Sequence, residues 1–241
     1  MRPAVGLAVG IALVGCGGTV ADLGDGPTAS EASPAVCVGF VDRVDVCALP
    51  LAPRPSAGLS ELAQGTSELW ALSRRTALEV AWACDALASW NPTTPVRDGA
   101  PPPTAGELQA KCQTARARVA SLAPRVIVAF SGHPGRCQSQ LCPAQGMRQC
   151  TRGDWVASVS ARDGELSLVD RTVLQAVLPV LYGALHAPLV DASSAVARGM
   201  PAIDSAYPTC ADELRAGVAA ASALASASAE AGGLVLGAFA P

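Results

Sequence analysis

The chain has 241 residues, of which half are apolar, 15% are charged and 4% are aromatic, and its formal net charge is −3. This length and apolar content are sufficient for one globular domain or two small ones. The slightly acidic balance disfavours nucleic acid as a partner, because no excess of basic residues can neutralise phosphates. Alanine accounts for 48 residues, so we expect a core built largely from small aliphatic side chains.

The first sixteen residues have the pattern of an export signal. Met1-Arg2-Pro3 is a short basic start, and residues 4–14 form an apolar run without charge. A helix of that length rises only about 16 Å, against a hydrocarbon core of about 30 Å. The run is therefore typical of a signal peptide and too short for a membrane span.

Residues 13–16, Leu-Val-Gly-Cys, resemble a bacterial lipobox. The resemblance to bacterial lipoproteins implies that Cys16 takes a diacylglycerol, that the peptide is cut before it, and that the new amine is acylated. It also implies membrane lipid as a partner and the cell envelope as the location. Gly17 and Gly18 stand where some bacteria place an inner-membrane retention Asp, which favours the outer membrane. The alternatives are an ordinary signal peptide with a chance cysteine and a mis-chosen start codon.

Composition divides the chain into three parts. Residues 1–15 form the predicted signal peptide, residues 16–33 a lipidated flexible tether, and residues 34–241 a disulfide-containing globular domain. Whether the globular part subdivides near residue 124 stays open. The predicted fold class is α+β and mostly helical, with helical hairpins and a small antiparallel sheet stapled by disulfides.

Helices are predicted in the first half of the globular part. One covers residues 34–50, and a long one covers residues 60–90, with a weak point at Gly65-Thr66 and a stop at Asn91-Pro92. After a proline-rich loop, Thr104 and Glu107 form a capping-box pattern. The next helix carries a regular apolar stripe: Leu108, Cys112, Ala115, Val119 and Leu122. We expect the helices on either side of the loop to lie antiparallel.

The second half predicts a small sheet and further helices. Residues 126–130 form a β-branched run, and residues 155–160 alternate toward Asp163-Gly164, which predicts a hairpin with residues 166–168 around that turn. A helix is expected from about residue 171 to 187, capped by Asp170 or Thr172 and kinked at Pro179. Its uncharged stretch, residues 172–190, is interpreted as a core helix in preference to a membrane span.

Three further elements complete the expected order. We predict a short helix at residues 189–198 and a capped one at residues 209–230. Residues 233–239 are expected to return to the small sheet as a terminal strand.

The nine cysteines support export. Setting Cys16 aside for lipid leaves an even number in a compartment that permits disulfides. Cys84 lies six residues before the end of its helix at Trp90, and Cys112 lies eight residues after the cap of the next, so an antiparallel hairpin would bring them together. We predict a Cys84–Cys112 disulfide. The remaining cysteines have no assigned pairing: Cys37, Cys47, Cys137, Cys142, Cys150 and Cys210.

Motifs for chemistry are few. His133 precedes three loop cysteines with irregular spacing, which favours disulfides over a metal site. His186 lies near the end of an apolar helix and is interpreted as structural, and Asp163 and Glu165 belong on a solvated turn. No nucleophile motif or phosphate loop is present. The sequence therefore predicts no catalytic residue, no metal and no cofactor.

From residue 67 onward, the chain resembles alanine-rich, cysteine-paired lipoproteins of some GC-rich bacteria. The matching pieces are residues 83–87, Lys111-Cys112, residues 126–128, the loop cysteines and Cys210. The resemblance implies no reaction or ligand. The expected function is that of an exported, membrane-anchored lipoprotein with a binding or structural role, and not an enzyme. The alternatives are an envelope enzyme with an unrecognised site and a metal-binding module around His133.

Overall fold

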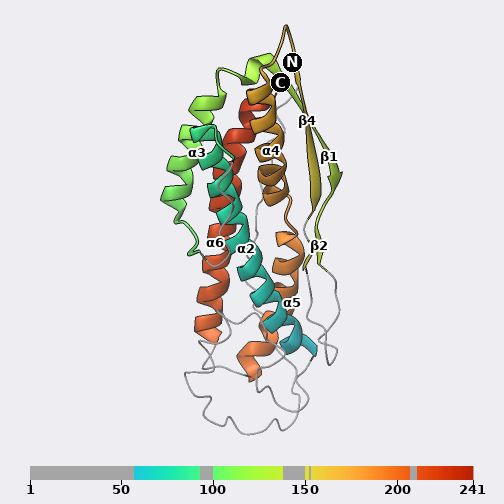
Figure 1. Ribbon diagram of the computed structural model, residues 1–241. Helices are drawn as coiled ribbons and strands as arrows, with labels where there is room; N and C mark the ends of the chain where they lie inside the picture. Colours follow the sequence, from blue (N-terminus) through green and yellow to red (C-terminus); the bar gives the residue numbers. More distant parts are fainter. Residues whose placement is uncertain (1–56, 93–99, 138–149, 152, 207–210, 241) are drawn as a thin grey trace, which may run out of the picture. The chain divides into compact units, whose positions relative to one another are not determined.

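The computed structural model (Figure 1) describes residues 57–92, 100–137, 150–151, 153–206 and 211–240. The chain divides into two compact units, Met1–Glu31 and Ala32–Pro241, and every described residue belongs to the second. The described part is mostly helical with a small antiparallel sheet, which confirms the predicted fold class. The predicted signal peptide, the tether and the helix at residues 34–50 lie outside the described residues.

The first two described helices agree closely with the sequence patterns. Helix α2 covers Ala57–Ser89 and continues without a break through Gly65 and Thr66. Helix α3 covers Ala105–Val119 and begins with the predicted capping box, in which the Thr104 side chain accepts from the Glu107 backbone and the Glu107 side chain accepts from the Thr104 backbone. The stripe is buried at four of its five positions: Leu108, Cys112, Ala115 and Val119.

The expected antiparallel arrangement of α2 and α3 is wrong, because the two helices run parallel. The guanidinium of Arg74, midway along α2, donates to the carbonyl of Ala100 at 2.7 Å, just before α3 begins. Further along both helices, Arg118 of α3 lies over the ring of Trp90 at the end of α2. Arg74 and Ala100 thus meet at one end of the helix pair and Trp90 and Arg118 at the other, so α2 and α3 point the same way. A stretch of this number of residues can span about 31 Å when extended, against about 24 Å of helix rise from Arg74 to Trp90, so the sequence between the helices is long enough for a parallel arrangement.

The main sheet has two strands that are distant in sequence. Strand β1, Val126–His133, pairs antiparallel with β4, Asp154–Ala161, in a register from Val126 opposite Ala161 to His133 opposite Asp154. At Gly132 (φ 148°) a Cβ would lie 1.9 Å from the Asp154 carbonyl oxygen, so this pairing requires glycine. A second short pair joins β2, Arg136–Cys137, to β3, Cys150–Thr151.

The predicted hairpin around Asp163-Gly164 is also wrong. Gly164 does form a turn, with φ 78°, but the turn leads into helix α4, Leu168–Leu185. The N-cap of α4 is Ser167, which accepts from the backbone N–H of Asp170, so the helix starts earlier than the sequence predicted. Pro179 lies inside α4.

The last helices are longer than expected. Helix α5 covers Leu189–Ala206, and α6 covers Ala211–Leu236 and ends in the short 3₁₀ helix η4, Gly237–Phe239. The predicted terminal strand at residues 233–239 is therefore wrong. The physical reason lies at Gly232, where a Cβ would be only 3.0 Å from Leu185 Cδ2. This glycine allows α6 to pack closely on α4 while remaining helical.

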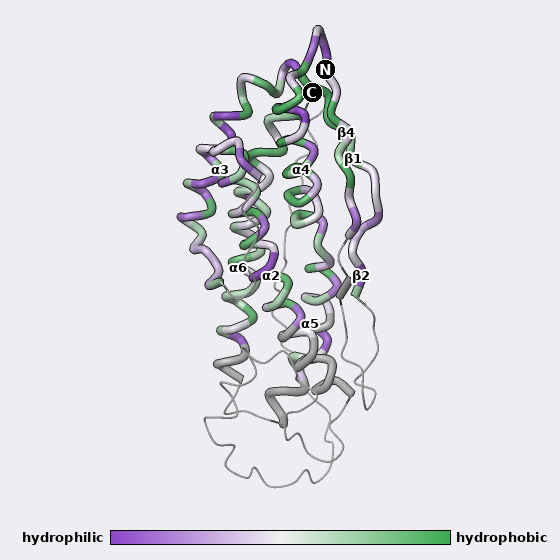
Figure 2. Tube along the Cα trace, viewed as in Figure 1, coloured by the Kyte–Doolittle hydropathy of each residue, from purple (hydrophilic) through white to green (hydrophobic). Residues whose placement is uncertain are grey.

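Helix α2 lies at the centre of the packing. It contacts α3, α4, α5 and α6, while α4 also packs on β4 and η4 contacts β1. Helices α4 and α6 are largely apolar in Figure 2, whereas α3 carries long hydrophilic stretches. Elements before and after residue 124 therefore contribute to one core. Its largest fully buried side chains are Leu87, Leu108, Leu174, Leu178, Leu181, Val80, Val119 and Val177.

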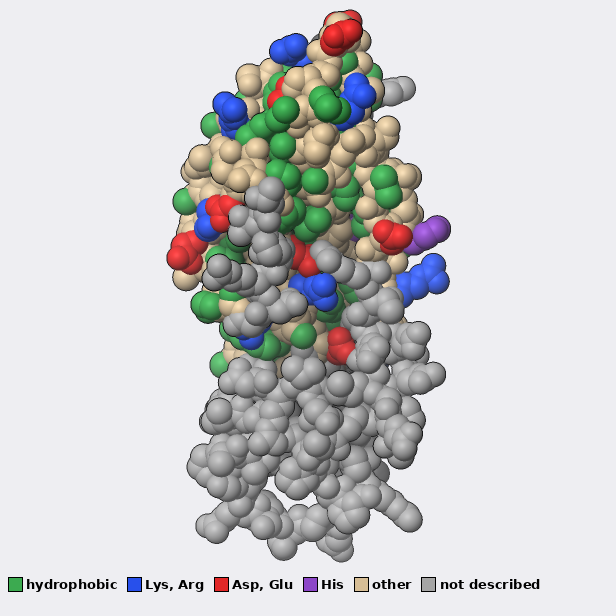
Figure 3. Space-filling model, in the orientation of Figure 1, with side chains coloured by type: hydrophobic (Ala, Val, Ile, Leu, Met, Phe, Trp, Pro, Cys, Tyr) green, Lys and Arg blue, Asp and Glu red, His purple; other side chains and the backbone are tan. Residues whose placement is uncertain are grey.

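Two helical stretches of the described chain have the length and composition of a membrane span, Leu168–Pro201 and Arg215–Phe239. Core helices of soluble proteins meet the same criteria. Helix α4 buries six side chains in the shared core: Val173, Leu174, Val177, Leu178, Leu181 and Ala184. This burial agrees with the interpretation of α4 as a core helix. On the face shown in Figure 3, charges of both signs are scattered among uncharged side chains.

Candidate functional site

The structure brings together one pair of the predicted site residues. Cys84 and Cys112 form a disulfide with a Cα–Cα distance of 4.8 Å, which confirms the predicted pairing although the helices are parallel. The parallel arrangement still places both residues at the same height along α2 and α3. The predicted lipid-attachment residue and four other cysteines lie outside the described residues: Cys16, Cys37, Cys47, Cys142 and Cys210.

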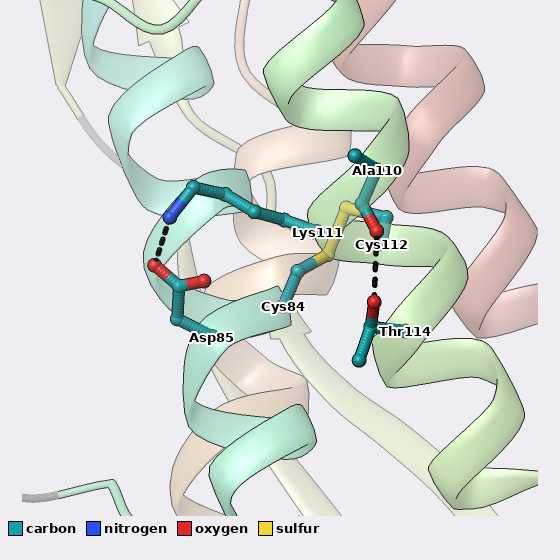
Figure 4. The surroundings of a disulfide bond; sticks show 6 residues. All are labelled: Cys84, Asp85, Ala110, Lys111, Cys112 and Thr114. Atoms are coloured by element: carbon teal, nitrogen blue, oxygen red, sulfur yellow. Dashed lines mark hydrogen bonds and ion pairs between the residues drawn. A yellow bond between two sulfur atoms is a disulfide. The ribbon is translucent and has the colours of Figure 1, made fainter.

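The disulfide lies in the interior, next to a surface ion pair. Both half-cystines are fully buried. Their chain neighbours Asp85 and Lys111 form an ion pair across the same two helices, and Thr114 donates to the carbonyl of Ala110 one turn away (Figure 4). A buried disulfide with no open access to its sulfur atoms acts as a structural link between α2 and α3.

The loop that suggested a metal site is described only at its ends. Cys137 is disulfide-bonded, which removes it as a thiolate ligand. In the β2–β3 ladder Cys137 lies opposite Cys150, while His133 is exposed at the end of β1. Among the described residues, no group of three or more His, Cys, Asp and Glu side chains is arranged to hold a metal ion.

An aromatic cluster joins the sheet to α4, and sequence reasoning missed it. The ring of Tyr182 stacks on Phe130 with centroids 4.0 Å apart, and Trp155 meets the edge of Tyr182 at 4.8 Å. Gly183 leaves space for the Trp155 ring, since a Cβ at this position would lie 3.2 Å from Trp155 Cδ1. The Trp155 indole N–H is buried without a hydrogen-bond partner. The chain holds only four tryptophans, two tyrosines and three phenylalanines. This scarcity of aromatic residues was the one sequence signal that could have pointed to the cluster.

His186 completes the aromatic cluster (Phe130, Trp155, Tyr182 and His186). It is the C-cap residue of α4, with its ring stacked on Tyr182 at 4.0 Å and its Nδ1 2.9 Å from the Tyr182 carbonyl oxygen. This contact fits the structural role predicted for His186, although the side chain is exposed. The imidazole therefore packs on the ring of Tyr182 and lies beside that of Trp155 on β4, whose centroid is 5.6 Å away.

A second cluster fixes the other end of α4. Trp90 follows α2 with φ 57°, a conformation that bulky residues rarely adopt. Its indole N–H donates to Asp170 Oδ1 at 3.0 Å, and the guanidinium of Arg118 lies 5.6 Å from its ring centroid. The backbone N–H of Asn91 bonds to the Ala86 carbonyl at 2.9 Å, the bond of a Schellman motif, in which glycine usually holds the position of Trp90.

The carboxylates of the turn and of the α3 cap are exposed. Asp163 and Glu165 lie on the solvated turn, as predicted. Hydrogen bonds from the backbone and the side chain of Thr104 hold the pKa of Glu107 below its usual value of 4.5, with a smaller contribution from Lys111. Asp163 and Glu165 therefore belong to the turn, and Glu107 belongs to the cap of α3.

Comparisons with the models of known protein families, with curated proteins and with solved structures give no match to this chain.

Proposed function

We propose that the protein is an exported lipoprotein of the bacterial cell envelope, anchored through Cys16, with a binding or structural role. The observation that carries this proposal is the order of signals at the start of the chain. A basic start, an apolar run and the Leu-Val-Gly-Cys box follow each other at the spacing of a lipoprotein signal. The outer membrane is the proposed destination, given Gly17 and Gly18 after the lipidated residue.

The buried Cys84–Cys112 disulfide supports export. Disulfides persist in oxidising compartments such as the bacterial periplasm and are rare in the cytosol. Here the bond links α2 to α3, and both of its half-cystines are fully buried. A chain with this cross-link is suited to a compartment in which the bond forms and remains.

Lipid attachment at Cys16 explains how the protein is held at a membrane. Each buried methylene of an acyl chain contributes about 0.8 kcal/mol, and a single chain binds only marginally. The two or three chains that the lipobox resemblance implies give a durable attachment. Residues 17–33 then act as a tether between the lipid and the folded part.

A binding or structural role is supported by the outer face of the sheet. Ile127 and Val156 are 49% and 60% exposed there, among serines and an alanine, with the charged side chains of Asp154 and Arg162 at the two ends of β4. Exposed apolar side chains framed by polar and charged ones fit a surface that contacts another molecule.

The lipid anchor is tested by replacing Cys16→Ser and following detergent partitioning and incorporation of labelled fatty acid. We expect the wild type to carry label and enter the detergent phase, and the variant to carry none. Cys112→Ser is the matched control, since loss of a later cysteine affects folding without removing lipid. An unlabelled wild type in the aqueous phase contradicts the proposal. A variant that stays in detergent after correct cleavage points to residues 172–190 as the anchor.

A further inference from the structure

The edge of β4 that faces away from β1 has no strand partner among the described residues. Arg162 lies opposite Arg125, one step beyond the last ladder pair, and donates its backbone N–H to the Arg125 carbonyl at 2.8 Å. Because bonded residues alternate along an antiparallel strand, even-numbered residues of β4 bond to β1, and odd-numbered residues direct their N–H and C=O groups to the other edge. Within the described residues no third strand pairs with that edge.

This edge also lacks the features that usually prevent strand pairing between molecules. Natural edge strands are protected by charged side chains, prolines, bulges or shortness. Residues 155–161 contain no charge and no proline, and β4 is eight residues long. Its outer-face side chains between the two ends are Val156, Ser158 and Ser160, all exposed. Residues 155–161 themselves therefore contain nothing that prevents pairing with another strand.

The charges that flank β4 are arranged symmetrically. Asp154 is the first residue of β4 and Arg162 follows its last, four residues before and after Ser158. The alternation of the strand, which the Arg162–Arg125 bond extends by one step, therefore places both on the outer face. Both are exposed, and neither forms an ion pair within the part of the chain that the structure describes. An antiparallel strand that meets its own copy with Ser158 on the axis places Asp154 opposite Arg162 of the copy at both ends.

We propose that two copies of this chain associate through β4, which pairs antiparallel with itself about a two-fold axis at Ser158. The even-numbered residues then occupy non-hydrogen-bonded positions, where facing Cα atoms are about 4.5 Å apart and side chains meet. Two ion pairs form between Asp154 and Arg162, Val156 packs on Ser160, and the two Ser158 hydroxyls meet on the axis. The contact is isologous and closes after two copies.

The ion pairs select this register. Moving the axis by one residue to Ala157 places Asp154 opposite Ser160, and both ion pairs are lost. The selected pairing yields a four-stranded sheet in the order β1, β4, β4, β1. Since a two-stranded sheet is marginally stable by itself, the second copy completes a sheet of ordinary size.

Charge reversal tests the pairing by sedimentation equilibrium of the full chain in density-matched detergent. We expect a dimer for the wild type and a dissociation constant about tenfold larger for Asp154→Arg and for Arg162→Asp, since each puts like charges opposite at both ends. The double variant Asp154→Arg/Arg162→Asp restores the pairs and the dimer. A monomeric wild type, single variants that bind as tightly as the wild type, or a double variant as weak as the singles would overturn the proposal.

Cross-linking tests the axis directly. Ser158→Cys brings two thiols within disulfide distance across the axis, so mild oxidation is expected to give a covalent dimer. Ser160→Cys is the matched control on the same face, because in this register residue 160 of one chain lies about 13 Å along the strands from residue 160 of the other. Equal cross-linking of the two variants, or none for Ser158→Cys, contradicts an axis at Ser158.

Discussion

Trp90 shows how one side chain can hold a strained backbone. Residues in the left-handed region other than glycine cost roughly 1 kcal/mol or more and persist where neighbours fix them. At φ 57°, Trp90 is fixed by its hydrogen bond to Asp170 and by the guanidinium of Arg118. The residue thereby joins the end of α2 to the beginning of α4 and to α3.

We expect Trp90→Phe to lower the free energy of unfolding by about 1 to 2 kcal/mol, because the indole donor to a carboxylate is lost while the backbone strain remains. Denaturant unfolding measures the change. Trp155→Phe is the matched control, since its indole N–H has no partner to lose. In a double-mutant cycle with Asp170→Ala, a coupling energy near zero would show that the Trp90–Asp170 bond contributes nothing.

At the scale of elements, the capping box of α3 makes stability depend on pH. The pKa of Glu107 is lowered by hydrogen bonds from the Thr104 backbone and hydroxyl, at 2.7 and 2.9 Å. A carboxyl group with a lowered folded-state pKa stabilises the fold above its unfolded-state pKa, and this contribution is lost as the pH falls through the folded-state pKa.

The comparison of wild type with Glu107→Gln tests this dependence, because glutamine does not titrate. We expect the stability advantage of the wild type, measured by denaturant unfolding, to shrink as the pH falls from about 6 through the pKa region of the carboxyl. An advantage that stays constant over this range means that the hydrogen bonds to Thr104 do not favour the ionised form.

Two neighbouring glycines of α6 have opposite expected effects. At Gly232 a Cβ would lie 3.0 Å from Leu185 and 3.2 Å from Leu181, whereas at Gly233 it would meet nothing within 4 Å. Gly232→Val should destabilise the protein by about 1 to 3 kcal/mol through overpacking against α4. Gly233→Ala should stabilise it by about 0.5 to 1 kcal/mol through helix propensity. Thermal unfolding of the two variants checks both signs, and a neutral Gly232→Val would mean that α4 and α6 separate easily.

The sequence predicted what depends on local patterns and failed where distant segments meet. The capping box at Thr104 and the apolar stripe of α3 are local, and both are confirmed. The turn at Gly164 exists, but the partner of β4 is β1, almost thirty residues upstream, and no local signal contains that pairing.

Two further outcomes have the same cause. The Cys84–Cys112 prediction is confirmed although its antiparallel premise is wrong, because the parallel packing of α2 and α3 also brings these two residues together. In the aromatic cluster, Phe130, Trp155 and Tyr182 come from three elements. Their meeting follows from tertiary packing, which neither composition nor periodicity reveals.

For the whole molecule, the disulfide is expected to be a large single contribution to stability. Its two residues are separated by 28 positions, so closing the loop restricts the unfolded chain by about 3 to 4 kcal/mol in the chain-entropy model. The double variant Cys84→Ala/Cys112→Ala should lose about this amount in denaturant unfolding. Asp85→Asn, which removes the exposed ion pair beside the disulfide, should cost under about 1 kcal/mol. Similar losses for the two variants would contradict a dominant role of the disulfide.

The same cross-link has a consequence for chain integrity. The stretch between α2 and α3 lies inside the loop that Cys84 and Cys112 close. If a protease cuts the backbone there, the two fragments stay covalently joined and α3 stays beside α2. The cleaved molecule, heavier by one water, stays in one piece until a reductant separates the fragments. One broken peptide bond therefore does not release the part of the protein that precedes it from the part that follows.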